Sequence, residues 1–326
     1  MLQVENLKKY FPVKSSFLGR KIAEVRALDG VSFSIATGET LGLVGESGCG
    51  KSTLARTILN FSEPTEGKVL FEGEDLTRLS HREMRKKRRD IQMIFQDPVS
   101  SLNPRMRVED LLSEPFIVHK INDKDFISKT IKHLLQKVGL KEESLQRYPH
   151  EFSGGQRQRI CIARALALNP KFIVCDEPVS ALDVSIRSQI LNLLVSLREE
   201  FKLTYLFISH DLAVIEHISD RIAVMYLGKI VELTDNASLF SQAKHPYSQA
   251  LMEAIPRAEV SEGEKRLLKR AKIISGDVPS PLNPPTGCHF HPRCPMAQER
   301  CRVEAPLLRN LGDHKSEHWV SCHYAK

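Results

Sequence analysis

The sequence lacks the features that insert a chain into a membrane. The opening residues, Met1–Asn6, carry neither the basic region nor the apolar region of a secretion signal. No apolar stretch approaches the ~20 residues needed to cross a bilayer, and no internal repeat or low-complexity segment is present. We therefore expect a globular chain that stays outside the bilayer. If it serves a membrane, it docks on subunits that other chains provide.

Close cysteine pairs are also absent. Of the seven cysteines, four gather near the C-terminal end, at Cys288, Cys294, Cys301 and Cys322. Without a secretion signal we do not expect disulfides, so this group predicts a metal site. Zinc modules usually contain pairs such as Cys-x-x-Cys, whereas four thiolates can equally hold an iron–sulfur cluster. The residues alone leave an iron–sulfur cluster, a zinc ion and free thiols open.

No aromatic residue interrupts the basic run Arg82–Arg89. Lys and Arg together number 47 against 40 Asp and Glu, which gives a formal net charge of +7. Basic runs can bind nucleic acid or anionic lipid, but a platform for single strands needs interleaved aromatic residues. We interpret the run as a solvated helix face and expect no nucleic-acid partner. Proximity to lipid is the lesser alternative.

Short apolar segments alternate with helical patterns along the chain. The expected strands are Leu2–Lys9, Val31–Ile35, Thr40–Val44, Lys68–Phe71, Ile91–Phe95, Phe172–Cys175, Thr204–Ile208 and the hairpin of Arg221–Tyr226 with Lys229–Leu233. The expected helices are Lys51–Phe61, Phe126–Val138 and Val184–Phe201. Strands of the kind buried in parallel sheets, alternating with helices, predict an α/β fold.

The composition changes after Pro256. A charged stretch at Glu259–Lys272 is followed by four prolines within residues 279–285, which predicts a linker or extended arm leading to the cysteine group. We therefore expect one domain at residues 1–256, with a helical part at about 97–168, and an extension at residues 257–326.

A phosphate-binding pattern stands between an expected strand and an expected helix. It fits the P-loop and reads Gly45-Glu46-Ser47-Gly48-Cys49-Gly50-Lys51-Ser52-Thr53. The glycines let backbone N–H groups curl around phosphates, and the helix N-terminus adds its positive end. We expect Lys51 to reach the β- and γ-phosphates and the Ser52 hydroxyl to bind Mg²⁺. Cys49 stands at a variable position, where we expect no more than a small residue.

Two acidic residues end the apolar strand at Phe172–Cys175. A carboxylate at the C-terminal edge of such a strand, facing a P-loop, is what Mg²⁺ coordination needs, and we assign this role to Asp176. The next residue, Glu177, is placed to polarise the attacking water. Two acidic residues after an apolar run are weak evidence for a catalytic site by themselves. Downstream of a P-loop they are strong evidence for one.

A third motif opens a helix and reads Ser153-Gly154-Gly155-Gln156. Ser153 can cap the helix, and the glycines let an anion approach its amides; taken alone, this is an ordinary N-cap. Between a P-loop and an Asp-Glu strand, however, the motif resembles the signature of ABC ATPases. The resemblance implies a P-loop NTPase core with an antiparallel β subdomain and a helical subdomain, so that residues 1–256 are the nucleotide-binding domain.

The other landmarks of that family follow from the resemblance. Gln96 resembles the Q-loop glutamine, which senses Mg²⁺ and the membrane partner, and Asp183 closes a segment similar to the D-loop. His210 resembles the switch histidine that contacts the γ-phosphate. Phe11 corresponds to the adenine-stacking aromatic, with Tyr10 as the alternative. In the family, the signature of one ATPase closes over ATP on the P-loop of another, and each motif occurs once here, so a second ATPase chain is implied.

A closer resemblance is to the ATPases of oligopeptide, dipeptide and nickel importers, nearest to the F-type dipeptide subunit. It rests on Gln96-Asp97-Pro98, Ser101–Arg105, His245-Pro246-Tyr247, Gly276–Pro281 and Cys288–Pro295. It implies ATP hydrolysis coupled to peptide uptake, at the cytoplasmic face of the inner membrane. The implied partners are a related, non-identical ATPase, two permease subunits and, indirectly, an extracytoplasmic solute-binding protein.

The same importer ATPases carry a [4Fe-4S] cluster at such a tail, so the resemblance favours iron–sulfur for Cys288, Cys294, Cys301 and Cys322. The alternatives to peptide import are uptake of nickel or another small solute, and a soluble ABC ATPase that transports nothing. Soluble ABC ATPases typically carry a long coiled-coil insertion or two tandem units. This chain has one unit, and only residues 54–152 separate its P-loop from its signature.

Overall fold

The computed structural model describes residues 1–14, 21–254, 276–312 and 317–326. They form two compact units. The first unit comprises Ile35–Thr40 and Arg78–Ser209 together with Met1, and the second comprises Leu2–Ser34, Leu41–Thr77 and His210–Lys326. None of the described helices combines the length and the hydrophobicity that crossing a bilayer requires.

The second unit contains an antiparallel sheet in the order β2-β1-β4-β5. Its strands are β1 (Leu2–Lys14), β2 (Lys21–Ile35), β4 (Glu66–Phe71) and β5 (Glu74–Asp75). β1 pairs with β4 from Leu2 opposite Phe71 to Lys8 opposite Glu66. The antiparallel part implied by the family resemblance is therefore confirmed. Both β1 and β2 are much longer than the segments expected from the sequence.

Five more strands of the second unit follow the order β11-β12-β10-β9-β3. They are β3 (Thr40–Val44), β9 (Arg221–Tyr226), β10 (Lys229–Asp235), β11 (Arg309–Asn310) and β12 (His318–Val320). β3 and β9 are parallel, whereas β10 pairs antiparallel with both β9 and β12. The C-terminal tail thus adds β12 to the sheet that carries the predicted P-loop.

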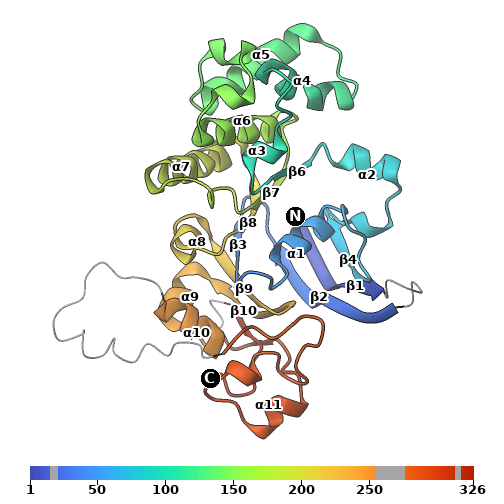
Figure 1. The fold of residues 1–326 in the computed structure, drawn as a ribbon, viewed down its shortest axis with the longest axis vertical. Helices are drawn as coiled ribbons and strands as arrows, with labels where there is room; N and C mark the ends of the chain where they lie inside the picture. Colours follow the sequence, from blue (N-terminus) through green and yellow to red (C-terminus); the bar gives the residue numbers. More distant parts are fainter. Residues whose placement is uncertain (15–20, 255–275, 313–316) are drawn as a thin grey trace, which may run out of the picture. The chain divides into compact units, whose positions relative to one another are not determined.

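The helices of the second unit lie between these strands along the chain (Figure 1). They are α1 (Lys51–Ile58), α8 (Leu212–Ile218), α9 (Asn236–Gln242), α10 (Pro246–Glu253) and α11 (Glu299–Val303). α9 contacts β9 and β10. α1 starts at the predicted residue but ends at Ile58 instead of Phe61.

The first unit is built on three parallel strands in the order β8-β7-β6. They are β6 (Ile91–Ile94), β7 (Phe172–Asp176) and β8 (Thr204–Ile208). Every residue of β7 and β8 is buried. This burial is what a continuous apolar run predicts for a strand covered on both faces.

The helical part implied by the family resemblance is confirmed, but its expected bounds of about 97–168 stay a prediction, because helices of the first unit also lie before and after them. These helices are α2 (His81–Lys87), α3 (Pro98–Ser101), α4 (Val108–Val118), α5 (Lys124–Lys137), α6 (Gly154–Leu166) and α7 (Val184–Phe201). α4, α5 and α6 contact one another (Figure 1). α5 buries Ile131, Leu134 and Leu135, and full burial of each such side chain stabilises by about 1.5–3 kcal/mol.

The basic run lies in and just after α2. Met84 is buried, while Arg82, Arg85 and Lys86 are exposed, as expected for a solvated helix face. The expected domain boundary at 256/257 and the charged stretch Glu259–Lys272 lie outside the described residues. The division into residues 1–256 and 257–326 therefore stays a prediction.

Candidate functional site

The predicted P-loop lies between β3 and α1, and its shape depends on two glycines. Gly45 has φ +155°, and a Cβ there would lie 2.2 Å from the carbonyl oxygen of Met225. Gly50 has φ +111°, and a Cβ there would lie 2.3 Å from the carbonyl oxygen of Ala27. A side chain at either position would need backbone to move, so the chain can take this path only with glycine.

Lys51 is held against the loop that precedes it. Its Nζ donates to the carbonyl oxygen of Gly45 at 2.6 Å and to that of Glu46 at 3.1 Å. Cys49 is buried beneath the loop, and its burial raises the pKa of the thiol, in keeping with a small packing residue. Ser47 and Gly48 are exposed, whereas Ser52 and Thr53 are partly buried in the first turn of α1. The ammonium is thereby fixed at the loop where a phosphate group is expected.

Glu46 is restrained at both its side chain and its backbone. Arg293 donates to it twice, from Nη1 to Oε2 at 2.7 Å and from Nη2 to Oε1 at 3.0 Å. The amide of Glu46 donates to the hydroxyl of Tyr247 at 2.9 Å. The paired carboxylate raises the pKa of Arg293 above its ordinary value. A residue of the predicted P-loop is therefore anchored to the C-terminal tail and to α10.

In the first unit, the structure brings Gln96 and Glu177 together. Gln96 Nε2 donates to Glu177 Oε2 at 3.0 Å, and the preceding residue, Asp176, is the buried last residue of β7. Glu177 has φ +47°, a left-handed backbone that is uncommon for a residue with a side chain. Its amide is held by the carbonyl oxygen of Ile208 at 3.0 Å. Strained backbone at a carboxylate supports a functional role for it.

The predicted signature begins α6. Ser153 is the N-cap residue and forms a capping box with Gln156, whose amide donates to the Ser153 hydroxyl oxygen. Ser153, Gly154 and Gln156 are exposed. Gly155 faces α7, because a Cβ there would lie 2.4 Å from Ile186 Cγ2. Packing therefore accounts for one of the two glycines, and the other leaves the helix start accessible.

The remaining predicted residues lie at exposed positions. Asp183 is the N-cap residue of α7 in the first unit, and His210 precedes α8 in the second. Phe11 lies in β1, is 40% exposed and has Lys9 Nζ 5.0 Å above its ring. Tyr10 is instead tied down, since its hydroxyl donates to Asp29 Oδ1 at 2.6 Å. Phe11 is therefore the freer of the two rings for stacking.

The four tail cysteines line one cavity together with His245, Phe290, His291 and His323. The amide of Cys288 donates to the carbonyl oxygen of Cys301 at 2.8 Å, which joins two segments that carry these thiols. Burial raises the pKa of Cys288 to about 11, and it also raises that of Cys294. Binding a metal there would therefore release protons. Among the described residues, no group of three or more His, Cys, Asp or Glu is placed so that it could hold a metal ion.

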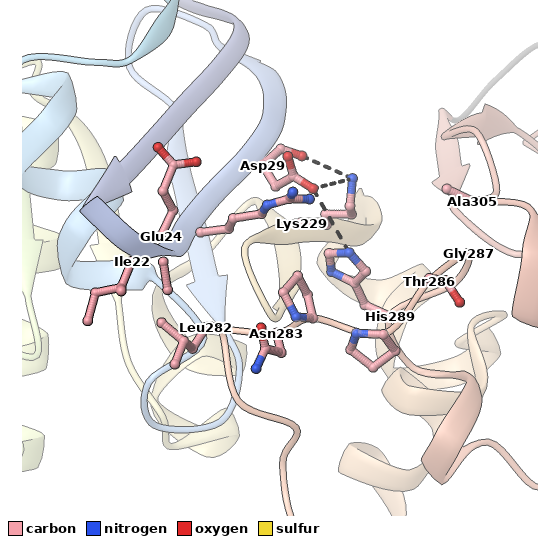
Figure 2. A pocket seen from close by; sticks show the side chains of 14 residues that line it. Ile22, Glu24, Asp29, Lys229, Leu282, Asn283, Thr286, Gly287, His289 and Ala305 are labelled. Atoms are coloured by element: carbon pink, nitrogen blue, oxygen red, sulfur yellow. Dashed lines mark hydrogen bonds and ion pairs between the residues drawn. The ribbon is translucent and has the colours of Figure 1, made fainter. Parts of the chain in front are cut away.

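A second cavity, of about 760 Å³, opens beside the tail (Figure 2). Lys229 Nζ lies 3.0 Å from Asp29 Oδ2, and His289 Nε2 lies 3.9 Å from the same oxygen. Burial would raise the pKa of Asp29, but its hydrogen bonds with Tyr10 and Lys229 hold it below its ordinary value. Burial lowers the pKa of His289, whose Nδ1 donates to the Leu227 carbonyl oxygen at 3.0 Å. Lys229 therefore pairs with Asp29, and His289 bonds the tail to the turn at Leu227, so this wall of the cavity anchors the tail.

Sequence reasoning missed the residues that connect the tail to the body of the second unit. Arg293, Tyr247 and Glu232 carry polar contacts that join segments far apart in the chain. The motif His245-Pro246-Tyr247 was noticed only as a family resemblance. His245 caps α10 locally, because its Nδ1 accepts from the Tyr247 amide at 3.1 Å, and the Tyr247 hydroxyl accepts a hydrogen bond from the Glu46 amide of the predicted P-loop.

Two family models match this chain. Residues 28–180 match the ABC transporter family, and residues 231–301 match the C-terminal region of oligopeptide/dipeptide transporters. The oligopeptide transport ATP-binding protein AppF of Bacillus subtilis (strain 168) is 51% identical over 325 residues, which are 99% of this chain and 97% of that protein. The probable peptide ABC transporter ATP-binding protein y4tS of Sinorhizobium fredii is 49% identical over 326 residues, 99% of this chain and 89% of that protein.

Solved structures show the same similarity. The dimeric ATP-binding cassette MJ0796, in a post-hydrolysis state with ADP and Pi, matches with a TM-score of 0.64 and 30% identity, over 72% of this chain and 99% of that one. Cassette cbiO1 from Clostridium perfringens, part of the ABC transporter complex cbiONQ, matches with a TM-score of 0.64 and 28% identity, over 74% of this chain and 90% of that one.

Proposed function

The chain belongs to the ATP-binding subunits of ABC transporters, on their oligopeptide/dipeptide branch, and we propose that its ATPase activity drives the import of peptides. The observation that carries this proposal is the 51% identity to an oligopeptide transport protein, which extends over 99% of the chain. The match to the transporter C-terminal region adds support, because it covers a part that the general cassette model does not reach.

The roles of individual residues form part of the proposal. The P-loop amides and Lys51 bind the β- and γ-phosphates of ATP, and Phe11 stacks on the adenine. Ser52, Asp176 and Gln96 offer the oxygen ligands that Mg²⁺ prefers, and the ion would neutralise phosphate charge when bound.

Glu177 orients and polarises the attacking water, and Gln96 fixes the carboxylate through the 3.0 Å hydrogen bond. His210 contacts the γ-phosphate. The exposed segment Ser153–Gln156 and Asp183 act on nucleotide held by a second ATPase chain.

We propose further that the pair of ATPases is formed with a related, non-identical chain and docks on two permease subunits. Docking takes place at the cytoplasmic face of the membrane, and a solute-binding protein outside the cell delivers the peptide. The dimeric state of the similar cassette MJ0796 supports pairing of ATPase chains.

The four tail cysteines are proposed to hold a [4Fe-4S] cluster. Four thiols on one cavity are a suitable donor set. A tetrahedral zinc site brings its sulfur atoms to about 3.8 Å from each other, given Zn–S bonds of about 2.3 Å. A cluster spaces its thiolates more widely, because each binds a different iron. The two occupants thus differ in the spacing of the thiolates that they need, and zinc remains the alternative occupant.

Uptake by living cells tests the transport proposal. A strain that lacks this gene is complemented with the wild-type chain or with Glu177→Gln, and uptake of labelled di- and oligopeptides is compared with uptake of nickel. We expect wild type alone to restore peptide uptake. Restored nickel uptake with no change in peptide uptake would instead support the alternative that the chain serves a nickel importer. Subunits that co-purify from the native membrane identify the partner chains.

A further inference from the structure

We propose that Arg293, in the C-terminal tail, is a positioning residue of the nucleotide site. It neutralises and holds Glu46, so that the P-loop can accept a triphosphate. The inference rests on the proposed function, because it takes residues 45–53 to be the loop that binds ATP.

The contact between these residues is direct and well aligned. Both guanidinium Nη atoms donate to the carboxylate, at 2.7 and 3.0 Å, across 247 positions of sequence. The side chain of Arg293 is 7% exposed and that of Glu46 is 27% exposed. Bidentate pairs of this kind are stronger and more directional than a lysine pair. The pair therefore fixes both the charge and the orientation of Glu46.

An unpaired carboxylate at this position would oppose the function of the loop. A P-loop binds anions through its amides and the helix N-terminus, and a negative side chain in the same loop repels the phosphates. At an effective dielectric of about 20, a unit charge about 10 Å away changes binding by roughly tenfold. Arg293 removes this repulsion by pairing.

Arg293 is itself held in place by its neighbours. Its guanidinium lies 5.9 Å from the centre of the Tyr226 ring. Phe290, from the same tail segment, packs edge-on against Tyr226 with ring centres 5.2 Å apart and lies 5.4 Å from Tyr247. Tyr247 in turn accepts the hydrogen bond from the Glu46 amide. One aromatic cluster thus supports the arginine and the backbone of the residue that it pairs with.

The segment that carries Arg293 is also fixed at its ends. It runs from Cys288 to Cys294, both on the cysteine cavity, and His289 donates to the Leu227 carbonyl oxygen at the turn between β9 and β10. The tail thus presents Arg293 to the loop from a segment that is anchored independently of Glu46.

The test measures the dissociation constant of Mg·ATP for the purified full-length chain by calorimetry. Arg293→Met should weaken binding about tenfold, and the double variant Arg293→Met/Glu46→Gln should bind within about threefold of wild type, because the unpaired carboxylate is gone. Arg293→Lys, which keeps the charge but loses the two parallel hydrogen bonds, should bind with an affinity between those of Arg293→Met and wild type. Arg300→Met is the matched control: it removes an arginine of the same tail that pairs with Glu304 at the surface, and should change nothing.

Each possible outcome of this test either supports or overturns the proposal. Wild-type affinity in Arg293→Met overturns the proposal, and so does a double variant that binds as weakly as the single one, since that pattern means a purely structural role. If Arg293→Met does not fold, the test uses Glu46→Gln alone. Weaker ATP binding by Glu46→Gln than by wild type would refute the proposal. Lys51→Ala serves a different purpose: unchanged ATP binding there would show that the proposed nucleotide site is wrong, whatever Arg293 does.

Discussion

Replacing Glu232 by glutamine should destabilise the second unit, because it removes one of two buried carboxylate oxygens that accept hydrogen bonds. The side chain of Glu232, in β10, is 0% exposed. Oε1 accepts from the Lys244 amide at 2.7 Å and lies 2.6 Å from His318 Nε2, and Oε2 accepts from the His245 amide at 3.0 Å. The carboxylate therefore joins β10 to the start of α10 and to β12.

The magnitude follows from the number of donors. Glutamine keeps only one of the two side-chain oxygens of glutamate. Its NH₂ group takes the place of the other oxygen and therefore faces a group that also donates. That leaves at least one buried donor without an acceptor, which costs about 1–3 kcal/mol, and the charge-assisted part of the remaining bonds is lost as well. We expect Glu232→Gln to lower the free energy of unfolding by about 2–4 kcal/mol.

The pH dependence has a definite sign. Burial alone would raise the pKa of Glu232, but the bonds from His318 and the Lys244 amide outweigh it and hold the pKa below its ordinary value. A carboxyl with a lowered pKa contributes its full stability above about pH 4.3, the ordinary value. That stability is lost as the pH falls through the folded-state pKa. Wild type and Glu232→Gln should therefore converge in stability in acid.

The only tryptophan of the chain makes the measurement selective. Trp319 lies in β12, opposite Leu233 of β10, so its fluorescence reports on the strand that Glu232 holds. Urea unfolding followed at Trp319 should show the loss at pH 7, whereas Glu304→Gln, in an exposed pair with Arg300, should leave the curve unchanged. A change below about 0.5 kcal/mol in Glu232→Gln, or an equal shift in the control, would refute the reasoning.

Three further predictions concern the proposed site and tail. Glu177→Gln should retain ATP binding but lower turnover by roughly two to four orders of magnitude, the range for loss of a general base; near-normal hydrolysis would contradict the assignment. Gly155→Val should destabilise the first unit by about 1–3 kcal/mol through overpacking against Ile186. Thermal unfolding should show that loss, but not in Gly154→Ala, where the nearest atom lies 3.5 Å away. Chain purified without oxygen should be brown, with about four irons and absorption near ~400 nm, and Cys294→Ser should bleach it. Stoichiometric zinc without iron would refute the cluster.

The parts of the fold that sequence predicted best are locally encoded. α7 occupies the predicted Val184–Phe201, and β8 occupies the predicted Thr204–Ile208. Each has a continuous pattern of its own, and in β8 every residue is buried. The P-loop lay where its motif places it, between β3 and α1. In these segments a few neighbouring residues determine the local structure.

The parts that sequence missed depend on distant pairing. β12 is three residues long, and its register with β10 joins Thr234 to His318 and Glu232 to Val320. Such a short strand has no period of its own to detect. The full length of β1 was missed for a related reason, since Tyr10 bonds through its amide to Thr65 and so depends on a segment beyond its own strand. Neither of these two long-range pairings can be detected from a short segment of the sequence.

The residues of the candidate site also fall into those that local motifs predict and those that only distant contacts reveal. Motifs predict roles for Lys51, Asp176 and Glu177, because phosphate and Mg²⁺ chemistry restricts which residues can stand at such positions. The residues that hold the loop are not restricted by that chemistry. Glu46 stands at a variable position of the P-loop pattern, and Arg293 is one of many arginines; only their 2.7 and 3.0 Å contacts single them out. A tail that appears in the sequence as a separate cysteine module therefore contributes a side chain to the loop expected to bind ATP, and substitutions in it should be assayed for nucleotide affinity as well as for metal content.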